Sequence, residues 1–213
     1  EDILNNYDSM ASVIMDDLKK IKKEYAAPRK TTVENAEEVV YEEKKIEEAP
    51  VVFLMDRFGY AKTVDTSVYE RNKETADAEN KYVFTCMNTD KICVFTDAGR
   101  MHLVKVMDLP YGKFRDKGTP VDNVSNYDSK TEQIVLVVSL SQVKEEMLCF
   151  VTQKGMVKQV EGSEFAVSKR TIGATKLGEE DRIVMVQPAG AMEHLVLQTR
   201  EGYFLKFLKE EIP

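Results

Sequence analysis

The hydrophobic pattern of the first 26 residues differs from that of the rest of the chain. Seven apolar residues recur at steps of three or four: Leu4, Tyr7, Met10, Ile14, Leu18, Ile21 and Tyr25. This spacing predicts one amphipathic helix, which Pro28 ends. An isolated helix of this kind buries its apolar stripe on a partner, and we expect that partner to lie outside this sequence or to be a second copy of it.

From residue 51 the pattern changes to short apolar runs. Four of them share one frame, an apolar strand, a polar turn ending in glycine and a second strand. The glycines are Gly59, Gly99, Gly155 and Gly202, separated by 40, 56 and 47 residues. Glycine supplies the positive φ that a tight hairpin needs. Repetition with this period predicts a mainly β, propeller-like array of about three to four blades.

Further apolar runs at 82–86, 134–139 and 183–186 come before the later glycine turns. We group each run with the hairpin that follows it, so that a unit consists of strand, loop, strand, turn and strand. Long polar segments, which we call excursions, connect these parts of the chain at 65–81, 108–133 and 161–182. The open edge near 204–208 predicts pairing with a second copy, as a homodimer or a swapped edge.

Composition excludes several classes of protein. The 213 residues are 43% hydrophobic and 31% charged, as in an ordinary globular chain. No apolar run has the length of a membrane span and the start is no signal peptide, so we expect no membrane partner and a cytoplasmic location. A helical opening without an initiator Met leads us to expect a piece of a longer polypeptide.

The net charge of −7 is unevenly distributed. Residues 1–50 hold 13 acidic and 8 basic side chains, and the run at 34–48 is charged throughout. We expect a solvated linker over 28–50, with a short strand as the alternative. Residues 51–213 hold 24 acidic and 22 basic side chains, so this part can present one basic face.

The residues themselves contain no catalytic or metal-binding pattern. Cys86, Cys93 and Cys149 lie in apolar runs without metal-type spacing, which predicts buried, reduced thiols. His102 and His194 are isolated in the sequence. We therefore expect this segment to have no catalytic residue, no metal and no cofactor.

Several spaced motifs resemble a known family. The segment LKKIKKEYAAPRKTTV is similar to the close of the breakage-reunion domain in the A subunit of bacterial type IIA topoisomerases. The repeats resemble that subunit's C-terminal β-pinwheel, a propeller-like ring whose rim binds and bends DNA. The matching pieces are FTDAGR and VTQKGMVK, then Gly118-Thr119-Pro120-Val121 and Gly173-Ala174-Thr175-Lys176, then Asp181-Arg182-Ile183.

The resemblance implies both a domain plan and a function. Residues 1–27 would be the helical tail of the upstream domain, 28–50 a linker and 51–213 part of the pinwheel. The segment would bind and bend duplex DNA without catalysis and guide duplex capture for an ATP-dependent topoisomerase, an isomerase. Its implied partners are double-stranded DNA, the ATPase B subunit of the enzyme, and the remainder of the A subunit.

One excursion distinguishes between members of the family. Gyrase A subunits carry a basic Q-R-R-G-G-K-G box in the first blade, whereas residues 69–77 have no glycine and mixed charge. This difference favours a topoisomerase IV-like subunit. A gyrase subunit with a degenerate box that still wraps DNA is one alternative, and a propeller-like protein-interaction scaffold is another.

Cationic residues near the glycine turns and in the excursions are the candidate DNA contacts. Neutralising successive phosphates releases condensed counterions, and nothing here resembles a base-reading helix. The candidates are Lys62, Arg100, Lys105, Lys113, Arg115, Lys117, Lys158, Lys169, Arg170, Lys176 and Lys206. The alternative for each is an ordinary surface role.

Overall fold

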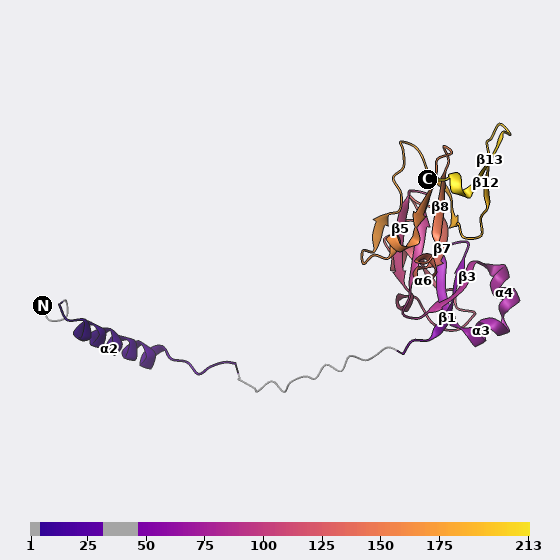
Figure 1. The fold of residues 1–213 in the computed structure, drawn as a ribbon. Coiled ribbons are helices and arrows are strands. Elements are labelled where there is room, and N and C mark those ends of the chain that lie inside the picture. Colours follow the sequence, from indigo (N-terminus) through magenta and orange to yellow (C-terminus); the bar gives the residue numbers. More distant parts are fainter. Residues whose placement is uncertain (1–4, 32–46) are drawn as a thin grey trace. The chain divides into compact units, whose positions relative to one another are not determined.

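The chain divides into two units, residues 1–44 and 45–213, which are described separately (Figure 1). The computed structural model describes residues 5–31 and 47–213. The predicted linker at 28–50 therefore lies largely outside the described residues. None of the described helices is both long and apolar enough to cross a membrane.

The first unit contains the predicted helix, α2 (Tyr7–Tyr25). Its start is capped by Asn6, whose side-chain oxygen accepts a hydrogen bond from the Asp8 N–H at 3.1 Å. Lys22 and Lys23 lie in the last turn, where they complement the negative end of the helix dipole. Within the first unit, none of the described residues covers the apolar stripe, and Leu18 is 54% exposed.

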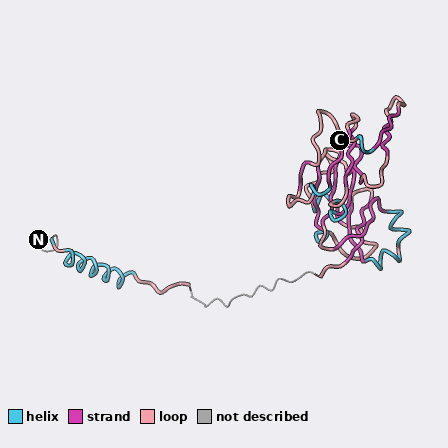
Figure 2. The backbone as a smooth tube through the Cα atoms, viewed as in Figure 1, coloured by secondary structure: helices cyan, strands magenta, loops and turns pink. Residues whose placement is uncertain are grey.

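The second unit is built from four antiparallel sheets (Figure 2). The first has the order β3-β1-β2-β6. Its strands are β1 (Pro50–Asp56), β2 (Tyr60–Asp65), β3 (Asn80–Met87) and β6 (Thr119–Pro120). Gly59 makes the β1–β2 turn with a φ of +84°. The sheet therefore combines a glycine hairpin with one flanking strand on each side.

The second sheet repeats this arrangement in the order β7-β4-β5-β10. Its strands are β4 (Lys91–Thr96), β5 (Arg100–Lys105), β7 (Ile134–Ser139) and β10 (Thr171–Gly173). The third sheet has the order β11-β8-β9, and the fourth is the hairpin β12–β13. Their strands are β8 (Met147–Thr152), β9 (Val157–Glu161), β11 (Ile183–Pro188), β12 (His194–Gln198) and β13 (Phe204–Leu208).

Short helices occupy the excursions and connections. They are α3 (Thr66–Arg71), α4 (Lys73–Glu79), η1 (Val106–Asp108), α5 (Val121–Val124), α6 (Leu140–Val143), η2 (Gly162–Phe165) and η3 (Lys209–Glu211). The excursion at 65–81 is thus largely helical rather than a polar loop. Val52 and Leu54 of β1 pack with Ala76 of α4, so this helix covers one face of the first sheet.

Strand pairing corrects our grouping of the repeat. The run at 82–86 lies in β3 and pairs with β1 of the preceding hairpin, as β7 pairs with β4 and β11 with β8. The outer strands come from further along the chain, because β6 follows the second hairpin yet pairs with β2, and β10 follows the third yet pairs with β5. Neighbouring sheets are therefore interlocked through exchanged strands.

Each sheet packs on the next through alternating side chains of its first hairpin strand. On β4, Ile92 and Val94 join the core shared with the first sheet, whereas Cys93 and Phe95 join the core shared with the third. Phe95 meets Phe150 of β8 edge to face at 5.9 Å. Three shared cores run through the four sheets in sequence, which confirms the mainly β, propeller-like fold preceded by an amphipathic helix.

A polar link also joins the second and third sheets at the Asp181-Arg182-Ile183 motif. The Arg182 guanidinium donates to the Asp97 carboxylate at 2.7 Å, and the Ile183 N–H donates to the Asp97 carbonyl at 2.9 Å. The Asp181 carboxylate accepts from the Lys154 N–H at 3.1 Å. This motif fixes one glycine turn against the next sheet.

Candidate nucleic-acid interface

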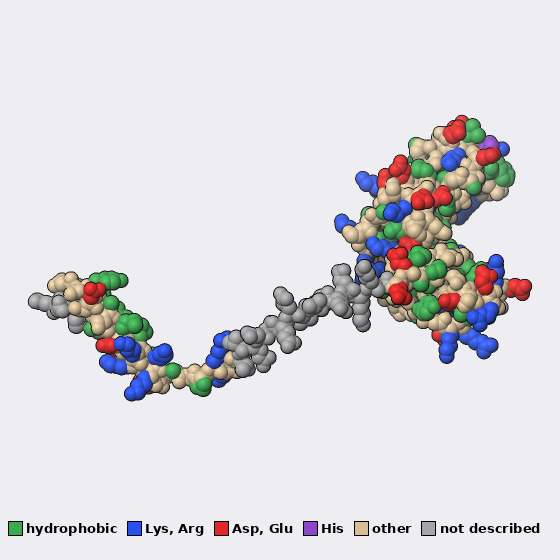
Figure 3. Space-filling view, turned by 60° about the horizontal axis from the view of Figure 1, so that its bottom comes forward, with side chains coloured by type: hydrophobic (Ala, Val, Ile, Leu, Met, Phe, Trp, Pro, Cys, Tyr) green, Lys and Arg blue, Asp and Glu red, His purple; other side chains and the backbone are tan. Residues whose placement is uncertain are grey.

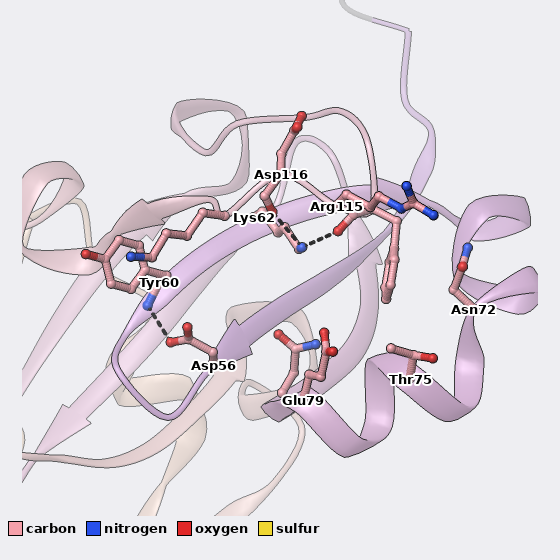
Figure 4. Close-up of a pocket in the computed structure, with 11 residues that line it drawn as sticks. Asp56, Tyr60, Lys62, Asn72, Thr75, Glu79, Arg115 and Asp116 are labelled. Atoms are coloured by element: carbon pink, nitrogen blue, oxygen red, sulfur yellow. Dashed lines mark hydrogen bonds between the residues drawn. The ribbon is translucent and has the colours of Figure 1, made fainter.

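Eight of the eleven predicted cations fall into three groups, each beside a glycine hairpin. The first group lies between β2, α4 and the segment 113–117, around a cavity of about 630 Å³ (Figure 4). Lys62, Arg115 and Lys117 line it together with the carboxylates of Asp56, Glu79 and Asp116. The cavity is therefore of mixed charge.

Lys62 is already engaged within this group. Its ammonium donates to the carbonyl oxygens of Phe114 at 2.5 Å and Asp116 at 2.7 Å and lies 5.1 Å from the Phe114 ring centre. Burial lowers the pKa of Lys62, although nearby carboxylates oppose the shift. Arg115 and Lys117 remain exposed, with the Lys117 ammonium 4.3 Å from the Tyr60 ring centre. These two are the members free to meet a phosphate.

The second group forms where β10 pairs with β5. The Leu103 N–H donates to the Arg170 carbonyl at 2.8 Å, which brings Lys169 and Arg170 from the third excursion to Lys105 on β5. Lys105 and Arg170 line one small depression with Lys91, and all three predicted cations of this group are exposed. Strand exchange therefore concentrates positive charge from distant parts of the sequence.

Lys91 was not predicted from the sequence. It lies directly opposite Lys105 in the β4–β5 register. The signal was available, because counting outward from the Gly99 turn pairs these two positions. The hydrophobic pattern gave no reason to name Lys91 as a DNA contact, because Lys91 begins a strand and the candidates were sought near the turns and in the excursions.

The third group surrounds a cavity of about 420 Å³ between β9 and residues 175–178. Lys158 and Lys176 line it together with Lys154, which was also not predicted from the sequence. Lys158 is half-buried with its ammonium 5.8 Å from the Phe150 ring centre, and Lys176 is exposed. The Lys154 ammonium donates to the Glu179 carbonyl at 2.5 Å.

The remaining candidates lie apart from these groups. Arg100 donates to the Glu132 carboxylate at 2.9 Å, so its charge is already paired. Lys113 is exposed, and Lys206 is exposed on β13 in the two-stranded sheet. Figure 3 shows basic and acidic side chains interspersed over one face of the second unit, with the basic ones in several separate groups.

A buried polar network lies beneath the second sheet. Glu132 is 3% exposed and accepts hydrogen bonds from the Thr96 hydroxyl at 2.6 Å and the Arg100 guanidinium at 2.9 Å. It also contacts His102 Nε2 at 3.1 Å, while His102 Nδ1 meets the Thr171 hydroxyl at 3.0 Å. Burial opposes ionisation of Glu132, but the hydrogen bonds and the Arg100 charge outweigh it and lower its pKa.

The arrangement provides no nucleophile or metal centre in the described part of the chain. Burial raises the pKa of Cys86 and Cys93 to about 12, so both thiols stay protonated near neutral pH. All three cysteines are buried and free, as expected. No group of three or more metal-ligating side chains is found within residues 5–31 and 47–213.

Comparison with known proteins identifies the fold. The C-terminal domain of a DNA topoisomerase IV aligns over 76% of this chain and 53% of its own, with a TM-score of 0.68 and 23% identity. The E. coli ParC C-terminal domain aligns over 77% of this chain and 66% of its own, with a TM-score of 0.62 and 14% identity. These neighbours define the architecture as a β-pinwheel C-terminal domain.

Sequence comparison gives the relationship. The family described as "DNA gyrase C-terminal domain, beta-propeller" matches residues 146–189. The DNA gyrase A subunit of Lawsonia intracellularis is 30% identical over all of this chain, and that of Clostridium acetobutylicum is 29% identical over 99%. The chain is thus similar along its length to gyrase A subunits, and its fold is that of the C-terminal domains of topoisomerase IV. It spans 27% of the length of these two relatives.

Proposed function

We propose that residues 47–213 bind and bend duplex DNA through phosphate contacts. The supporting observation is that strand exchange brings exposed cations of an excursion beside those of a distant hairpin, as with Lys169 and Arg170 beside Lys105 on β5. Separate groups along successive blades suit a curved phosphate backbone, and Arg115, Lys117 and Lys176 extend the series. Specificity would come from DNA deformability, because the α-helices described within residues 47–213 have at most seven residues.

Within a whole protein, this domain would guide duplex capture by an ATP-dependent type IIA topoisomerase in the cytoplasm. Residues 1–27 would continue the breakage-reunion domain, and the segment 28–50 would be a linker. The remainder of the A subunit would supply the cleavage chemistry, while the ATPase B subunit would supply the energy coupling. The domain itself would contribute binding and geometry and no catalytic group.

A topoisomerase IV-like role is supported by the first excursion. The region corresponding to the basic gyrase box forms α3 and α4, and α4 buries Ala76 against the first sheet. A segment that covers a core is not free to wrap DNA. The gyrase names of the relatives favour the alternative, a gyrase subunit that wraps DNA with a degenerate box. A chiral wrapping assay with relaxed plasmid separates the two, since strong wrapping supports gyrase.

The test of DNA binding uses the 213-residue chain and a fluorescent duplex of about 40 base pairs at low salt. A duplex labelled at both ends reports bending by energy transfer. The proposal predicts saturable binding with a shorter end-to-end distance. Binding without a change in the end-to-end distance of the duplex would contradict the proposal that the chain bends DNA.

A protein-interaction role is the second candidate, and the β12–β13 hairpin favours it. Tyr203, Phe204 and Leu205 are 71%, 68% and 59% exposed on the hairpin that projects from the unit in Figure 1. Exposed apolar side chains on an open edge suit a partner protein or a second copy. Light scattering tests the homodimer directly, because a monomeric mass excludes it.

A further inference from the structure

The first two sheets receive their exchanged segments at the same position of the hairpin. In the first sheet, the Thr63 N–H of β2 donates to the Pro110 carbonyl at 3.0 Å. In the second sheet, the Leu103 N–H of β5 donates to the Arg170 carbonyl at 2.8 Å. Each donor lies four residues after its turn glycine. The two hairpins can therefore be compared position by position.

The residue just before this donor contacts the exchanged segment with its side chain in both sheets. In the first sheet it is Lys62, whose ammonium donates to the carbonyl oxygens of Phe114 and Asp116. In the second sheet it is His102, whose Nδ1 lies 3.0 Å from the hydroxyl of Thr171 on β10. One position of the hairpin thus fastens an exchanged segment by two different chemistries.

The imidazole of His102 is completely buried, and its second nitrogen is also engaged. Nε2 lies 3.1 Å from the carboxylate of Glu132, which accepts further hydrogen bonds from Thr96 and Arg100. Because an ionised carboxylate only accepts hydrogen bonds, Nε2 carries the proton toward Glu132. In the neutral ring, Nδ1 is then the acceptor for the Thr171 hydroxyl. The ring therefore links a fixed carboxylate to the exchanged strand.

Thr171 transmits this link to the exposed cations. It lies directly opposite His102 in the pairing of β10 with β5, and its hydroxyl oxygen also accepts from Asn126 at 3.2 Å. The exposed residues Lys169 and Arg170 come immediately before it. β10 has three residues, so its backbone makes few ladder hydrogen bonds. The position of the two cations consequently depends on side-chain contacts of this strand.

We propose that His102 is a positioning residue for DNA binding by the second group of cations. Held by Glu132, it retains Thr171 and keeps β10 on β5, so that the two cations before Thr171 stay beside Lys105. His102 itself does not meet DNA, because it is buried. The DNA part of this inference rests on the proposed function, whereas the anchoring of β10 does not.

Amide hydrogen exchange of the 213-residue chain, followed by NMR, tests the anchor without DNA. Thr171→Val keeps the shape of a partly buried side chain and removes its hydroxyl. Exchange of the Leu103 amide should become about tenfold faster, because β10 opens locally more often. The Thr63 amide, its counterpart in the first sheet, should keep its rate. Thr171→Ser retains the hydroxyl and should exchange as wild type does.

Asn126→Ala is the matched control, because it removes the other partner of the same hydroxyl at an exposed position. It should leave exchange of the Leu103 amide nearly unchanged. An effect as large as that of Thr171→Val would assign the anchor to Asn126 and overturn the role of His102. Unchanged exchange at Leu103 in Thr171→Val, or equal acceleration at Thr63, would overturn it as well.

Binding of the duplex of about 40 base pairs gives a readout that a purely structural role would not change. In conditions where each variant is folded, Thr171→Val should flatten the salt dependence by up to about 0.9 for each of the two displaced cations. Thr171→Ser should match wild type. An unchanged slope for Thr171→Val would contradict the positioning role. Failure of the wild type to bind would overturn the proposed function and the DNA part of this inference, while the exchange rates would still decide whether His102 anchors β10.

Discussion

The ammonium of Lys62 and the carbonyl oxygen of Asp116 lie 2.7 Å apart although 54 residues separate them in sequence. Together with the bond to Phe114, this contact fastens the segment 113–117 to β2 (Figure 4). The exposed side chains of Arg115 and Lys117 therefore project from a segment held at its base. Lys62 was predicted to contact a phosphate, and in the structure it instead positions other cations.

Replacing Lys62 tests this role. Lys62→Met should lower the free energy of unfolding by about 1–2 kcal/mol, because two carbonyls lose a charged donor. Urea denaturation followed by circular dichroism measures it. The matched control Lys117→Met removes an exposed lysine of the same segment and should stay within about 0.5 kcal/mol of wild type. Equal effects of both variants would contradict an anchoring role.

The Glu132 network should be the most sensitive polar site of the second sheet. Glu132→Gln keeps the shape but replaces a carboxylate that accepts from Thr96 and Arg100. Loss of these charge-assisted bonds should cost about 2–3 kcal/mol of unfolding free energy, which urea denaturation measures. Glu164→Gln, at an exposed position, is the control and should be nearly neutral.

The same carboxylate predicts a pH dependence. Since the pKa of Glu132 is lower in the folded chain, its ionised form stabilises the fold above the ordinary glutamate pKa of 4.5. That stability is lost as pH falls below 4.5 through the folded pKa. Unfolding measured from about pH 7 to about pH 3 should show a smaller acid loss for Glu132→Gln than for wild type. Parallel curves would rule out this contribution.

Two glycines of the matching motifs should differ in tolerance. Gly118→Ala should destabilise the fold by about 1–3 kcal/mol, because it combines a positive φ with a Cβ approach of 2.6 Å to Ala61. At Gly173 the φ is not positive and a Cβ would have no atom within 4 Å, so Gly173→Ala should be close to neutral. Thermal unfolding compares the two. Similar melting temperatures would contradict this prediction and would mean that the first sheet rearranges to accommodate a Cβ at position 118.

Local sequence signals predicted the elements well and their partners poorly. The step of three and four predicted α2, and Gly59, Gly99, Gly155 and Gly202 predicted the hairpins. Periodicity identifies a strand but carries no information on which strand lies beside it. For this reason β3 was grouped with the following hairpin, and the exchange of β6 and β10 was not foreseen.

The candidate site was predictable to a similar extent. Charge and spacing selected the exposed cations Lys105, Lys169 and Arg170, and strand exchange then brought them together. The roles of Lys62 and Arg100 depend on contacts across 54 and 32 residues, which no local pattern encodes. His102 looked isolated for the same reason, since its partner Glu132 lies 30 residues away.

The central claim is that exposed cations grip DNA phosphates, and the salt dependence of binding measures this most directly. Association of the 213-residue chain with a duplex of about 40 base pairs should weaken linearly in log–log form as salt rises. Replacing Lys105, Lys169 and Arg170 with alanine should reduce the slope by about 0.9 for each phosphate that is no longer neutralised. Replacing the exposed cations Lys73, Lys144 and Arg200 should leave it unchanged. No binding at low salt, or equal slopes for the two triple variants, would contradict the claim.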